Sequence, residues 1–108
     1  MEMIKKFAPI LLAALLATSA HADFKSGNEL LDHVNADNYY NKGSALGYMT
    51  GVIDAYAGIY FCPPATITGG QVQDIVRSYL TQNPSTRHEG ASILVYRAIV
   101  EFFPCKKK

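Results

Sequence analysis

The sequence has no tryptophan, only two cysteines and few charged residues, and these shortages exclude several kinds of protein. Charged side chains make up 18% of the chain and the formal net charge is +1, so no basic patch of the kind that binds nucleic acid is present. The apolar run over residues 7–17 is shorter than the ~20 residues that span a bilayer. We therefore expect no nucleic-acid partner and no stable membrane insertion.

The N-terminal residues 1–22 have the pattern of a signal peptide. Lys5 and Lys6 precede the apolar run, and small residues follow it, ending in Ala20-His21-Ala22. Alanines at both positions of an A-x-A site are typical of signal cleavage. We predict cleavage after Ala22, export to the periplasm and a single mature domain over residues 23–108.

The two cysteines, Cys62 and Cys105, both lie in this mature domain. Cysteines of small exported domains usually pair, because the compartment is oxidising. A domain of this size buries only ~60–65% of the surface of its unfolded chain, so a cross-link would help its stability. The sequence predicts a Cys62–Cys105 disulfide and argues against two free thiols.

Apolar residues recur with helical spacing, and no alternating strand pattern extends beyond a few residues, so we expect an all-α fold. It should be a small bundle of four to five helices. The expected helices cover residues 27–36, 44–61 and 70–82, with a last helix that begins between residues 84 and 89 and ends near Phe103. Capping boxes are predicted at Ser26–Glu29 and Thr68–Gln71, and a polar connection over residues 35–43.

The helix over residues 44–61 should be central, because it carries almost no charge. Its bulky apolar face would contain Ala45, Tyr48, Met49, Val52, Tyr56, Ile59 and Tyr60. Gly47, Gly51 and Gly58 fall on the other side, where we expect another backbone to approach closely. Asp54 lies among these glycines. An ion pair with Arg87 or Arg97, or contact with water, is a simpler explanation for it than acid–base chemistry or partner contact.

No catalytic set is evident in the mature domain. Its histidines, His33 and His88, lack the i, i+4 spacing of metal ligands, and both cysteines are assigned to the disulfide. His33 should be exposed to solvent. We predict that the protein is not an enzyme and that it has no metal site and no cofactor.

A set of short motifs extends over nearly the whole mature domain. It comprises Gly27 with Leu30-Leu31, Gly47-Tyr48-x-x-Gly51-Val52-x-Asp54, Phe61-Cys62-x-Pro64, Val72-x-x-Ile75-Val76-x-x-Tyr79-Leu80, Pro84-x-x-Arg87, Ala91 and Pro104-Cys105. In order and spacing this pattern resembles the Rap/Tai immunity proteins, the exported partners of type VI secretion amidase effectors.

The resemblance implies a small all-helical periplasmic protein, often a homodimer, that binds and inhibits a peptidoglycan amidase. Members of this group commonly block the active-site cleft of the effector with a loop. The matching residues are mainly structural, so they indicate the fold better than the contacts. The alternative function is a periplasmic helical stress chaperone or envelope accessory protein.

An inhibitor should insert a protruding, pre-ordered segment, because ordering a flexible loop costs affinity. The connection over residues 83–89 is the first candidate, with Ser85, Thr86, Arg87 and His88 as contacts. The loop over residues 63–70 is the alternative, with Thr66, Ile67 and Thr68. In the last helix, Ala91, Leu94, Val95, Ala98 and Phe102 should face the core. The second stripe, Ile93, Tyr96 and Val100, either covers the first helix or forms a homodimer interface centred on Tyr96.

Overall fold

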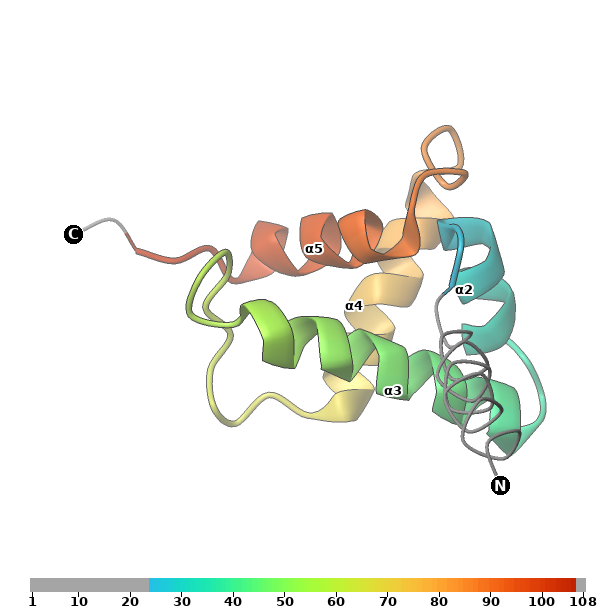
Figure 1. Ribbon diagram of the computed structural model, residues 1–108, viewed down its shortest axis with the longest axis horizontal. Helices are drawn as coiled ribbons and strands as arrows, with labels where there is room; N and C mark the ends of the chain where they lie inside the picture. Colours follow the sequence, from blue (N-terminus) through green and yellow to red (C-terminus); the bar gives the residue numbers. More distant parts are fainter. Residues whose placement is uncertain (1–23, 107–108) are drawn as a thin grey trace, which may run out of the picture.

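The computed structural model describes residues 24–106, so the predicted signal peptide and its cleavage site lie outside the described residues. Its helices are α2 (Gly27–Val34), α3 (Tyr39–Tyr56), α4 (Gly69–Gln82) and α5 (Ala91–Phe102). α3 and α5 lie side by side, α4 crosses behind both, and α2 lies near the start of α3 (Figure 1). The all-α bundle and the Cys62–Cys105 disulfide are confirmed. Among the described helices, no candidate for a membrane-spanning segment is found.

The core takes apolar side chains from all four of these helices. Fully or almost fully buried are Leu30, Val34, Ala45, Met49, Val52, Ile53, Phe61, Val72, Val76, Leu80, Ala91, Leu94, Val95, Ala98 and Ile99. On α4, Val72, Val76 and Leu80 are buried in the core, and Asp74 and Ser78 on the polar side are exposed. Every pair of these helices is in contact, and burial of this shared apolar surface is the main force that holds the bundle together.

The central helix is displaced along the sequence from its predicted range of 44–61. It begins at Tyr39 because the Asn38 side chain accepts a 2.8 Å hydrogen bond from the Asn41 amide and so caps it. The prediction of a connection over 35–43 is therefore wrong for residues 39–43. The helix ends at Tyr56, and Gly58 then takes a φ of 83°, a left-handed conformation that favours glycine.

This early end of α3 changes the role of the next residues. Ile59 and Tyr60 lie outside the helix and are mostly exposed, so their placement on its apolar face is wrong. Phe61 turns back into the bundle and is fully buried. The following Cys62 donates its amide to Phe103 O at 2.8 Å, beside the disulfide to Cys105.

The other helices begin and end nearer to their predicted limits. At α2 the Ser26 hydroxyl accepts from the Glu29 amide, but the Glu29 carboxylate accepts from the Lys25 amide and not from that of Ser26. The Thr68–Gln71 capping box of α4 is confirmed in both directions. α5 begins only at Ala91, because the residues before it form turns. Phe102 is exposed, so its predicted place in the core is wrong.

Candidate functional site

The segment over residues 83–90, called loop 83–90 below, projects from the bundle between α4 and α5 (Figure 1). Two successive turns shape it: the Thr86 amide donates to Asn83 O at 3.3 Å and the Glu89 amide donates to Thr86 O at 2.9 Å. The Asn83 side chain donates to Tyr79 O at 2.8 Å and ties the loop to the end of α4. The loop is therefore ordered by its own hydrogen bonds.

The four predicted contact residues of this loop divide into two pairs. Ser85 and His88 are exposed at its tip, together with Pro84. Thr86 and Arg87 are half-buried, and both donate hydrogen bonds within the protein: the Thr86 hydroxyl to Asn83 O, and the Arg87 guanidinium to Asn28 Oδ1 and Leu80 O. The tip side chains can meet a partner directly, whereas the other two support the loop.

An ion pair fixes the C-terminal end of loop 83–90 to α5. Arg97 Nη1 donates to Glu89 Oε2 at 2.8 Å, and Nη2 donates to Oε1 at 3.4 Å. This hydrogen bonding, with the positive charge of Arg97, lowers the pKa of the Glu89 carboxyl below its usual value of 4.5, although partial desolvation opposes the change. The same interaction raises the pKa of the Arg97 guanidinium.

The Glu89–Arg97 pair predicts a pH-dependent contribution to stability. Because the folded-state pKa of Glu89 is the lower one, the pair stabilises the protein above the unfolded-state pKa, and this contribution is lost as the pH falls through the folded-state pKa. Glu89→Gln should lower the melting temperature at about pH 7, and the difference from wild type should shrink towards about pH 3. Thermal unfolding across this range checks it, with Glu101→Gln on the exposed side of α5 as the control for loss of one carboxylate. A Glu89→Gln difference that does not vary with pH would contradict it.

The alternative loop offers fewer free side chains than predicted. Thr66 is exposed, but Ile67 is half-buried against the core. The Thr68 hydroxyl accepts from the Gln71 amide as the cap of α4. Of the three predicted contacts in this loop, only Thr66 is free of a structural role.

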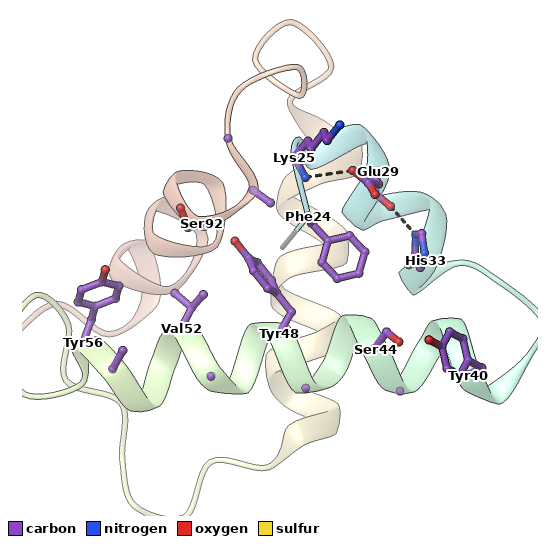
Figure 2. A pocket seen from close by; sticks show the side chains of 16 residues that line it. Phe24, Lys25, Glu29, His33, Tyr40, Ser44, Tyr48, Val52, Tyr56 and Ser92 are labelled. Atoms are coloured by element: carbon purple, nitrogen blue, oxygen red, sulfur yellow. Dashed lines mark hydrogen bonds between the residues drawn. The ribbon is translucent and has the colours of Figure 1, made fainter. Parts of the chain in front are cut away.

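Sequence reasoning missed an open groove of about 1140 Å³ that lies between α3, the chain around the start of α2 and the start of α5 (Figure 2). Gly43, Gly47 and Gly51 line it, and a Cβ built at any of them would meet nothing within 4 Å. A Cβ built at Gly58 also meets nothing within 4 Å, so the expected close backbone approach at Gly47, Gly51 and Gly58 is wrong for the described chain. Aromatic side chains stand along the groove, among them Phe24, Tyr40, Tyr48 and Tyr56. Two regular spacings in the sequence could have indicated this groove. Glycines recur every four residues, at 43, 47 and 51, and tyrosines recur every eight, at 40, 48 and 56, so that each set forms a row along α3.

The second stripe of α5 is only partly exposed. Tyr96 is half-buried and its ring contacts those of Tyr60 and Phe61, while Val100 packs partly against the core. Ile93 is 50% exposed. A small hollow of about 320 Å³ lies here, lined by Tyr56, Tyr60, Ser92, Ile93 and Tyr96. The stripe thus has a core side, formed by Tyr96 and Val100, and an exposed apolar side. We call the exposed surface formed by Ile93, Tyr56 and Tyr60, with Tyr96 at its inner edge, the Ile93 patch.

The remaining ionisable candidates are dispersed. His33 is half-buried, not exposed as predicted, because its ring packs edge-on against Phe24 and its Nδ1 lies 3.0 Å from Glu29 O. Asp54 is exposed to water, and the arginines proposed as its partners bond elsewhere. Over residues 24–106, no three His, Cys, Asp or Glu side chains gather into a group that could hold a metal ion.

The described helical domain is closed by a disulfide and presents an ordered polar loop, so a partner that binds this loop would not have to order it first. Among known families, the model of the Rap1a immunity proteins matches residues 26–105, and the chain belongs to this family. It therefore has the role of an immunity protein against a secreted effector. No curated protein matches the chain.

Proposed function

We propose that this immunity protein acts in the periplasm, where it binds and inhibits a type VI secretion peptidoglycan amidase and so protects the producing cell. The observation that carries the proposal is loop 83–90, which is polar at its tip and held by hydrogen bonds at both ends. Membership of an immunity family supports an effector as the partner. The N-terminal signal pattern supports the compartment.

The proposed mechanism is occlusion of a concave site. A catalytic cleft is a concave site with a few well-placed polar groups. Ser85 and His88 offer hydroxyl and imidazole groups at the tip to pair with them. Because loop 83–90 is already ordered, binding avoids much of the entropy cost of fixing a flexible segment.

The direct test uses the chain purified from the periplasm after export and an exported amidase encoded beside its gene. We expect the two to co-purify, and peptidoglycan cleavage by the amidase to stop at a near-equimolar ratio. An amidase that remains fully active in a large excess of the protein would overturn the proposal. Protection of unrelated unfolding proteins, with no tight partner, would instead support the chaperone alternative.

We also propose that the protein forms a homodimer through the Ile93 patch. Exposed apolar surface of this kind usually marks an interface, and a twofold axis would bring two copies of it together. The partly exposed rings of Tyr56 and Tyr60 extend the patch around Ile93. Tyr96 lies at its inner edge against Phe61, so Ile93 replaces Tyr96 as the position to test.

Ile93→Asp should yield a folded monomer, because it places a charge in the apolar interface while sparing the core. Sedimentation should show the dissociation constant of the dimer rising by about tenfold or more. Phe102→Asp is the control, since Phe102 is also exposed on α5 but lies outside the patch. A wild-type protein that is monomeric at high concentration, or an Ile93→Asp variant that still dimerises, would contradict this interface.

A further inference from the structure

The first turn of α2 and loop 83–90 share backbone hydrogen bonds although they are distant in the sequence. A helix leaves its first N–H groups without partners inside the helix. In α2 the Gly27 amide donates to Glu89 O at 3.0 Å, and the Asn28 amide donates to Arg87 O at 2.9 Å. The Ser26 hydroxyl accepts a hydrogen bond from the Glu29 amide. The backbone carbonyls of Arg87 and Glu89 thus cap part of the start of α2, and the same two hydrogen bonds hold the loop in place.

Gly27 allows this close approach. A Cβ at this position would lie 2.9 Å from Arg87 O, and also 2.4 Å from Leu94 Cδ1 and 3.0 Å from Leu80 Cδ2. The two leucine side chains are buried in the core, and Arg87 O belongs to the backbone of the loop. A side chain at Gly27 would therefore have to displace the loop from α2 as well as shift these two leucines.

The Arg87 side chain makes a second connection between the same elements. Its Nε donates to Asn28 Oδ1 at 3.0 Å, and its Nη1 donates to Leu80 O near the end of α4 at 3.1 Å. One guanidinium thus joins loop 83–90 to two helices. A point charge such as lysine could not reproduce this forked geometry.

We infer that the first turn of α2 is a latch that holds loop 83–90 in its binding conformation, with Gly27, Asn28 and Arg87 as positioning residues. This inference rests on the proposed function of the loop. The latch stabilises one conformation before the effector arrives, while Ser85 and His88 remain exposed at the tip. The protein thereby presents a contact surface that is tied to α2.

The latch is tested without an effector by following the loop itself. Gly27→Ala should raise amide hydrogen exchange at Thr86 and Glu89 by about tenfold or more, and Asn28→Ala by about three- to tenfold, the factor for a net loss of about one hydrogen bond. Trypsin cleavage after Arg87 should rise in parallel, because the protease must bind the released guanidinium. Two variants serve as controls: Gly43→Ala, which lies outside the loop and where a Cβ meets nothing within 4 Å, and Asn28→Asp, which keeps an acceptor oxygen. Both should stay close to wild type.

The binding arm uses the amidase that the wild-type protein inhibits. We expect Gly27→Ala and Asn28→Ala to weaken inhibition at a temperature where circular dichroism shows both folded, and Asn28→Asp to retain it. Unchanged exchange and trypsin cleavage in folded Asn28→Ala would overturn the latch, even if Gly27→Ala failed to fold. If exchange in the loop rises but inhibition of the amidase is unchanged, the latch does not position the loop for binding. If the wild-type protein inhibits no amidase, the proposed function fails, and exchange alone decides whether the latch exists.

Discussion

Replacing Ser85 and His88 together by alanine should weaken binding of the amidase by about ten- to a hundredfold. A few side chains in a desolvated centre carry most of the binding energy of an interface, and these two are the exposed polar groups at the tip of loop 83–90. Neither makes a bond that shapes the loop, so the variant should keep its helical content and melting temperature. Titrated inhibition of peptidoglycan cleavage measures the effect.

The structure refines the choice of variants for this experiment. Thr86→Ala would remove a hydroxyl that bonds to Asn83 O, and Thr68→Ala would remove the cap of α4, so neither separates contact from folding. Thr66→Ala is the matched control, because Thr66 is exposed on the alternative loop. If inhibition is unchanged in the Ser85/His88 variant and weakened by Thr66→Ala, the loop over residues 63–70 is the one that binds.

Removing the disulfide, by Cys62→Ser with Cys105→Ser, should lower the free energy of unfolding by about 4 kcal/mol. The two cysteines are 43 residues apart in the sequence. In the chain-entropy model, opening a loop of this length increases the entropy of the unfolded chain, and this stabilises the unfolded state by about 4 kcal/mol. For a domain of this size, the melting temperature should fall by roughly 15–30 °C. Thermal unfolding of the double variant measures the loss.

Wild-type protein in a reductant is the control, and its melting temperature should fall to that of the double variant. A fall of only a few degrees would show that the described packing around Phe61 suffices without the cross-link. Loop 83–90 precedes the start of α5 at Ala91, whereas the disulfide at Cys105 follows the other end of that helix. Below its melting temperature the double variant should therefore still inhibit the amidase, which separates stability from binding.

The sequence alone determined those features that depend on local signals. The Thr68–Gln71 capping box and the apolar spacing of Val72, Val76 and Leu80 identify α4 to within one residue of its start. The cysteine pairing followed from there being only two cysteines in a chain whose N-terminal pattern predicts export. The motif pattern indicated the immunity family that the family model shows. In each case the feature follows from residues that are close in the sequence or from the composition of the chain.

Only the tertiary structure decided which side chains of the candidate site are available. The sequence predicts that Arg87 contacts a partner. In the structure its guanidinium instead bonds to Leu80 O and to Asn28 Oδ1, and Asn28 is distant along the chain. The groove along α3 exists because no described element covers Gly47, although three interior glycines predict a close neighbour. Packing between distant segments sets both outcomes, and helical periodicity records which residues share a face but not what lies against that face.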